Sequence, residues 1–254
     1  MSHFLVFVKK ELVEYARTYK LLILLVVFII FGIMNPLVAK LTPELLTSFM
    51  PEGMFVTIPE PTALDSWAQF FKNTQQMGLI VLLLVFSGVL GTELTKGTLI
   101  NLLTKGLSRQ AVVLAKYTAM VLVWTLSVVV SAMLTWIYTV YLFPDGPMGY
   151  LFVAIFCMWL FGVFLLALLL ASATMVRGNY GGLLLTGLAL VILMVVNIFP
   201  EAHTYNPLSL GAKNMSLVSG TVDPSSLYAA MVVSTLAICG LLFLSVLVFQ
   251  KKEL

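Results

Sequence analysis

The stretch Glu93–Lys116, ELTKGTLINLLTKGLSRQAVVLAK, is a long polar interruption between two apolar runs. On a helical wheel, Leu99, Leu102 and Leu103 share one arc. Ser108 stands directly before a long apolar run, where serine is a preferred N-cap. The pattern predicts a short surface helix, a glycine break, and a second helix that enters the membrane. An ordinary basic loop between two spans is the alternative interpretation.

Composition places the chain in a membrane. Of its 254 residues, 61% are hydrophobic and 10% are charged, and the mean hydropathy is +1.06. Soluble domains carry roughly 25% charged residues, so this chain has too little polar surface for a water-facing globule. The net charge of +3 does not indicate a nucleic-acid partner. Cys157 and Cys239 both sit in apolar runs, which favours buried thiols over a disulfide or a metal site.

The hydropathy pattern predicts an all-α fold, a polytopic membrane helical bundle in a single domain over residues 1–254. Residues 1–20 alternate charge with apolar groups at helical spacing, which is typical of an amphipathic helix in the membrane interface and in contact with lipid. Six spans follow, each long enough or nearly long enough to cross about 30 Å of hydrocarbon. They cover residues 21–39, 77–92, 111–142, 149–175, 181–199 and 227–249.

The two longer connections also carry patterns. Asn35-Pro36 is expected to kink or end the first span. The connection 41–76 is rich in proline, and within it residues 62–73 predict a short helix at the outer interface, anchored by Trp67, Phe70 and Phe71. In the second connection, 200–226, residues 208–218 are apolar enough to dip into the membrane.

Basic residues distribute unequally across these spans. Six spans place both termini on one side, and most of the cations fall on that side. The positive-inside rule makes this side cytoplasmic. They are Lys9, Lys10, Arg17, Lys20, Lys96, Lys105, Arg109, Lys116, Arg177, Lys251 and Lys252. Only Lys40, Lys72 and Lys213 are expected outside.

Motifs for chemistry are absent from the sequence. It holds no G-x-x-x-x-G-K-[ST] nucleotide loop, no H-E-x-x-H and no credible G-x-S-x-G site. We therefore predict no catalytic residue, no metal site and no cofactor in this chain, so any ATP hydrolysis belongs to another polypeptide. No ionisable residue lies near the middle of a predicted span, whereas ion-coupled carriers usually keep one there. His3 and His203 are expected to be solvated.

A repeat of small hydroxyl residues marks one side of the third predicted span. Its members recur at every fourth position: Ser127, Ser131, Thr135 and Thr139. This spacing suits close helix packing, including packing in a dimer, and it also suits the lining of a translocation pathway. Both interpretations stay open at this point.

The opening stretch resembles a known family. E-L-T-K-G-T-L-I-N-L-L-T-K-G-L-S-R, followed by Lys116, closely resembles the loop after the second span in type-2 ABC transporter permeases. Supporting stretches are P-T-A-L-D-S-W-A-Q-F-F-K-N from Pro61 and Y-N-P-L-S-L from Tyr205. The six-span plan and the amphipathic N-terminus match as well. Gly106 departs from the pattern, because many relatives have a proline there.

The resemblance implies an exporter permease that pairs with a second permease, as a homodimer or heterodimer. Each would bind a cytosolic ATPase that holds ATP and magnesium. A short cytoplasmic coupling helix over residues 97–104 would dock on the ATPase, and Glu93 and Arg109 would brace it against the N-terminal helix. The residues implied in coupling are Glu93, Gly97, Thr98, Leu99, Leu102, Leu103, Thr104 and Arg109.

The predicted function is therefore outward transport of an amphipathic or hydrophobic cargo, a peptide, toxin or drug, with energy from a separate ATPase. The predicted location is a bacterial plasma membrane with both termini in the cytoplasm. A secondary transporter without an ATPase is the alternative, and a structural or signalling membrane protein is a third. Co-purification of an ATPase distinguishes them.

Overall fold

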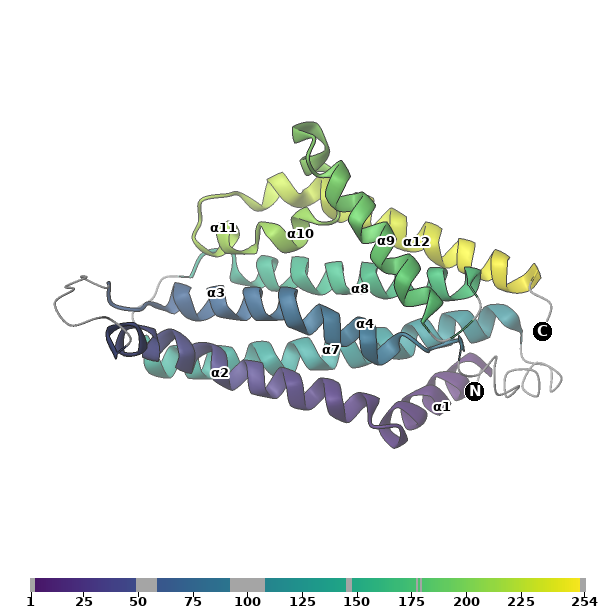
Figure 1. Cartoon of the computed structure of the whole chain (residues 1–254), viewed down its shortest axis with the longest axis horizontal. Coiled ribbons are helices and arrows are strands. Elements are labelled where there is room, and N and C mark those ends of the chain that lie inside the picture. Colours follow the sequence, from purple (N-terminus) through teal and green to yellow (C-terminus); the bar gives the residue numbers. More distant parts are fainter. Residues whose placement is uncertain are drawn as a thin grey trace.

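The computed structural model describes residues 3–48, 59–91, 108–144, 148–176, 178 and 180–251. All regular elements within those ranges are helices. The long helices lie alongside one another, and both termini lie at the same end of the bundle (Figure 1). The predicted fold class, an all-α membrane bundle, is confirmed.

Within these described ranges, four helices are long and apolar enough to cross a membrane. They are α2 (Lys20–Ser48), α7 (Arg109–Leu142), α8 (Leu151–Met175) and α12 (Tyr228–Lys251). A shorter apolar helix, α9 (Gly181–Val196), packs on α8. A further rod is built from three segments that follow one another without a break: α3 (Ala63–Asn73), η1 (Thr74–Gly78) and α4 (Leu79–Phe86).

Of the two outcomes predicted for Pro36, an end or a kink of the first span, the end is wrong. Helix α2 runs on to Ser48 with Pro36 and Pro43 inside it. A proline in a helix lacks the N–H that would bond the carbonyl four residues earlier. For Pro36 that carbonyl belongs to Gly32, and the hydroxyl of Thr135 on α7 donates to it at 3.3 Å. A neighbouring helix thus supplies the missing hydrogen bond, which is how membrane helices tolerate proline.

The helix predicted at residues 62–73 exists, but its aromatic residues do not lie at an outer interface. Trp67 and Phe70 are 0% exposed, and their rings pack edge to face with centroids 5.2 Å apart. A capping box starts the helix, in which the backbone N–H of Thr62 donates to Asp65 at 2.8 Å. Since α3 continues directly into η1 and α4, this segment belongs to the bundle.

Helix α8 forms the centre of the bundle, with most of its residues buried. At its contact with α7, the indole N–H of Trp124 donates to the carbonyl of Trp159 at 3.0 Å. The indole of Trp159 in turn donates to the hydroxyl of Thr125 at 2.9 Å. A methyl group at Gly162 would overlap the Trp124 ring. Glycine at this position therefore allows the two helices to approach closely.

The second connection folds back onto this centre. It contains four short helices, and Leu210 and Leu217 from two of them are fully buried. The four are η2 (Pro200–Thr204), α10 (Ser209–Ala212), α11 (Asn214–Val218) and η3 (Pro224–Leu227). Both α10 and α11 pack on α8. Whether this segment enters the membrane stays a prediction.

Candidate functional site

The two helices that flank the predicted coupling segment in sequence reach the same end of the bundle, because α4 ends and α7 begins at the end where α1 begins and α12 ends (Figure 1). Of the residues predicted for coupling, Arg109 is described. The others lie outside the described residues: Glu93, Gly97, Thr98, Leu99, Leu102, Leu103 and Thr104. The structure therefore shows the flank of the candidate site rather than its centre.

Helix α7 begins where the sequence predicted. The hydroxyl of Ser108 accepts a hydrogen bond from the backbone N–H of Ala111 at 3.2 Å, so Ser108 is the N-cap. A serine in this place satisfies one of the N–H groups that have no partner at the start of a helix. This cap sets the position of Arg109 in the first turn.

Arg109 reaches the end of α12. Its guanidinium donates to the carbonyl of Phe249 at 2.9 Å and to that of Gln250 at 2.8 Å. It also stands 6.0 Å from the centre of the Phe249 ring. The last carbonyls of a helix lack partners and carry partial negative charge, so a cation there is favourable. Arg109 thereby joins the start of α7 to the last turn of α12, a contact that the sequence analysis did not predict.

Helix α1 (His3–Arg17) is joined to α7 by a buried ion pair. The ammonium group of Lys116 lies 3.0 Å from both carboxylate oxygens of Glu11. Lys116 is 1% exposed and Glu11 is 0% exposed. Lys10 also bonds Glu11, at 2.9 Å. Removing one partner of such a pair leaves an uncompensated buried charge, which is strongly destabilising.

Sequence reasoning identified Lys116 but missed Glu11. The signal was present, since Glu11 stands four residues after Phe7 and four before Tyr15, and both of these aromatics are buried. A carboxylate on the apolar face of a helix indicates a buried partner.

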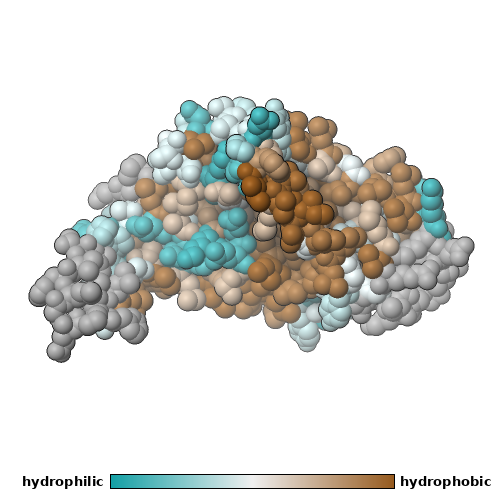
Figure 2. All heavy atoms as spheres, turned by 45° about the horizontal axis from the view of Figure 1, so that its top comes forward, coloured by the Kyte–Doolittle hydropathy of each residue, from teal (hydrophilic) through white to brown (hydrophobic). Residues whose placement is uncertain are grey.

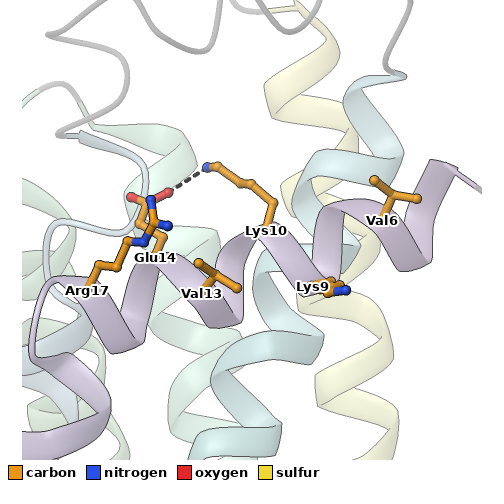
Figure 3. A pocket seen from close by; sticks show the side chains of 6 residues that line it. All are labelled: Val6, Lys9, Lys10, Val13, Glu14 and Arg17. Carbon is orange, nitrogen blue, oxygen red and sulfur yellow. Dashed lines mark ion pairs between the residues drawn. The ribbon is translucent and has the colours of Figure 1, made fainter.

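The opposite face of α1 forms a shallow hollow of about 480 Å³. Figure 3 shows its side chains, with Lys10 reaching toward Glu14, and their ion pair spans 2.6 Å. Three basic residues, two valines and one glutamate line it: Val6, Lys9, Lys10, Val13, Glu14 and Arg17. One face of α1 thus holds α7 through Glu11, while the other presents mixed basic and apolar groups.

The small hydroxyl residues of α7 are all buried inside this chain, each with 0% exposure: Ser127, Ser131, Thr135 and Thr139. Thr139 shares a 2.6 Å hydrogen bond with Ser66 on α3, and Thr135 bonds α2 as described above. Ser127 bonds the Val123 carbonyl of its own helix at 2.9 Å. Three contacts of the repeat are therefore within one chain, and a role in a pathway or a dimer stays a prediction.

Side chains for metal chemistry do not gather in the described part of the chain, where no group of three His, Cys, Asp or Glu residues could hold an ion. Cys157 and Cys239 are both free thiols. Cys157 is buried as predicted, but Cys239 is exposed on α12, contrary to the prediction. An exposed thiol in an apolar helix fits a surface that faces lipid or another membrane protein.

Comparison with known proteins identifies a family. A family model described as "ABC-2 family transporter protein" matches residues 5–254, nearly the whole chain. No individual curated protein matches the sequence.

Proposed function

The chain belongs to the ABC-2 transporter family, whose members are membrane transport subunits, and we propose that it is the permease of an exporter driven by a separate ATPase. It is a multi-pass membrane protein with no catalytic role of its own. The family generally implies an ATPase partner. Export, the coupling residues, the second permease and the cargo are the proposed parts.

The observation that carries the proposal is the anchoring of the first turns of α7. Arg109 bonds the end of α12, and Lys116 bonds Glu11 on α1. The predicted coupling helix, residues 97–104, directly precedes this anchored end. An ATPase that pushes on residues 97–104 would therefore move α7 together with α1 and α12. Helix α7 has 34 residues, or about 51 Å at about 1.5 Å each, so the motion would be transmitted across the bundle.

A second permease would cover part of the apolar surface that the chain exposes. Helix α9 buries only Gly182 and Thr186 within the described chain, while Leu184 and Leu188 are 73% and 57% exposed. A homodimer or a heterodimer would both suit such a surface, and lipid would cover the remainder. Rocking of the two permeases about their shared seam would open a route outward for an amphipathic or hydrophobic cargo.

The proposed orientation places both termini and the coupling helix in the cytoplasm of a bacterial cell. The excess of basic residues on that side supports it. ATP and magnesium would bind in the partner chain.

The decisive experiment changes the predicted docking face. We expect Leu102→Glu with Leu103→Glu to remove the ATPase chain that co-purifies with the tagged permease from its native membranes. The reason is that two carboxylates cannot enter an apolar groove. The matched control is Thr47→Glu with Ser48→Glu, which adds the same two charges at exposed positions in the last turn of α2. Equal recovery of ATPase from both variants would contradict the coupling role, and a wild-type permease that transports without any ATPase would favour a secondary transporter.

A further inference from the structure

A row of polar side chains runs along the outward face of α3 and η1. The residues are spaced at i, i+3, i+4 and i+7, which places them on one face of a helix. Lys72 and Gln76 are exposed, and the other two are half-buried. We call these four residues the polar strip: Gln69, Lys72, Asn73 and Gln76. In Figure 2, hydrophilic residues gather in a teal patch left of the centre of the molecule, and brown apolar surface lies beside it.

The polar strip lies deep along the bundle. The side-chain amide of Asn73 donates to the amide oxygen of Asn35 on α2 at 2.6 Å. Five residues further along, Gly78 packs against the ring of Phe28, also on α2. Both Phe28 and Asn35 belong to the uncharged run of residues 21–39. Gln76 lies between these two contacts and therefore lies level with the middle of an apolar span.

A polar group that is exposed at this depth must meet water or another protein rather than lipid. A lysine extends its ammonium group toward the membrane surface along its long stem, but the short amide of Gln76 cannot reach a headgroup from the middle of a span. Polar groups at membrane depth occur where they line a water-filled cavity or contact protein. The neighbouring residues Met77 and Ile80 are 58% and 57% exposed and apolar, so the polar strip has apolar surface beside it.

Two further observations mark the same segment. Its backbone is a π-helix, in which the N–H of Leu79 bonds the carbonyl of Thr74, and such segments are frequent at functional sites. In α3, η1 and α11, which packs on α3, three residues bury polar atoms that find no partner in the described part of the chain: Trp67, Thr74 and Asn214. A buried polar group without a hydrogen bond costs about 1–3 kcal/mol, and water near η1 would remove that cost.

The charge on the polar strip has one sign. Lys72 is cationic and the other three members are neutral amides. The nearest acidic residue on the same helix, Asp65, is engaged by the N-cap, since it accepts from the backbone and the hydroxyl of Thr62 at 2.8 and 2.9 Å. An anionic group beside Lys72 would meet a cation and several amide donors.

We propose that the polar strip lines a water-filled cleft that admits the head of an anionic amphiphile, with Lys72 as its counter-charge. The apolar body of the molecule contacts the exposed apolar side chains of η1 and α4. The assignment of the anionic amphiphile as a cargo rests on the proposed export function. The access of water to the polar strip does not depend on that function.

Chemical labelling tests water access. Single cysteines are placed at Gln76 and, as a matched control, at Leu236, which is 66% exposed on α12. The background carries Cys239→Ser and keeps the buried Cys157. The purified full chain in lipid nanodiscs is treated with charged methanethiosulfonates. The cysteine thiolate attacks the reagent, which forms a mixed disulfide and releases methanesulfinate. Because a thiol in apolar surroundings stays protonated, we expect Gln76→Cys to react at least about tenfold faster than Leu236→Cys. Equal, slow rates would overturn the cleft.

The charge of the reagent tests Lys72. For each reagent, the rate at Gln76→Cys is divided by its rate with a free thiol in solution. We expect this ratio to be about three- to tenfold larger for the sulfonate reagent than for the trimethylammonium reagent, because a cation concentrates anions in a cleft. Lys72→Gln should abolish this preference and Lys72→Arg should keep it. A preference that survives Lys72→Gln would overturn the role of Lys72. Thermal unfolding of each variant verifies that it is folded.

A matched pair of probes tests the cargo class. Dansyl-labelled undecanoic acid and its methyl ester differ in the charge of the head and by one methyl group. Their fluorescence reports binding to the nanodisc-embedded chain above that to empty nanodiscs. We expect the acid to bind more tightly than the ester. Lys72→Gln should lower the affinity for the acid by about tenfold and leave the affinity for the ester unchanged. Equal binding of both probes would overturn the anionic cargo. None of these measurements involves ATP or an ATPase, so a failure here is distinguishable from a failure of the proposed export function.

Discussion

At its first turns α7 is held by charged groups, whereas at its last turns it is held by hydroxyl groups. Arg109 and Lys116 bond α12 and α1 at one end. Thr135 and Thr139 bond α2 and α3 toward the other. Separating a buried ion pair leaves charge unpaired, while hydroxyl bonds between membrane helices contribute only about 0.6 kcal/mol on average. The comparison implies that the start of α7 moves together with α1 and α12. The contacts of its other end with α2 and α3 should separate more easily.

The largest expected effect comes from the ion pair. Lys116→Met should lower the free energy of unfolding by about 3–5 kcal/mol, because it leaves the carboxylate of Glu11 buried and unpaired. Thermal unfolding of the purified chain measures this. Adding Glu11→Leu to Lys116→Met should restore most of the stability, since replacing both charges with apolar groups is often neutral. A double variant as unstable as the single one would contradict this account.

The next prediction concerns the middle of α7, where Trp124 packs against Gly162 of α8. Gly162→Ala should destabilise the chain by about 1–3 kcal/mol, because the added methyl group overlaps the Trp124 ring and overpacks the contact. Trp124→Phe in the same chain should recover part of the loss by opening space. Gly187→Ala on α9 is the matched control, since nothing lies within 4 Å of the added group there. A loss at Gly187 equal to that at Gly162 would refute the packing argument.

A smaller effect is expected at the first turn of α7. Arg109→Gln removes the charged donor to Phe249 and Gln250 and should cost about 1 kcal/mol. The loss should be local, so hydrogen exchange of the last turn of α12 should accelerate while the middle of α8 stays protected. If exchange in the last turn of α12 is unchanged, Arg109 does not hold that helix end.

The smallest effect is expected toward the other end of α7. Ser66→Ala and Thr139→Val each remove one side of the 2.6 Å hydroxyl contact. A double-mutant cycle on unfolding free energies should give a coupling energy of about 0.6 kcal/mol. A coupling as large as that of Glu11 with Lys116 would remove the distinction between the two ends.

Local signals in the sequence predicted local features well. Ser108 was identified as the N-cap of α7, because the preference of serine for the N-cap position depends only on neighbouring residues. Thr62 was correctly predicted to start a helical stretch, whereas the predicted end at Asn73 is wrong, because the helix continues into η1 and α4. The same reasoning misplaced Trp67 and Phe70 at an outer interface, since an aromatic cluster looks alike whether it faces lipid or a neighbouring helix.

The candidate site was predicted in part for a similar reason. The loop motif pointed to the correct family, and it identified Arg109 and Lys116 as residues near the site. Their bonding partners could not be read from spacing, because Glu11 and Phe249 stand far away along the chain. A charge in a sequence shows that a partner is needed without showing which one it is.

Composition by itself determined that this protein is a helical membrane bundle, because a chain with so few charged residues cannot cover a surface in water, and its loop motif determined the family. Only the tertiary structure decided that α2 passes through Pro36, that α3 joins α4, and that α1 and α12 both hold the start of α7. Each of these depends on a hydrogen bond, an ion pair or a packing contact from a distant part of the chain, and such contacts exist only after the helices have assembled.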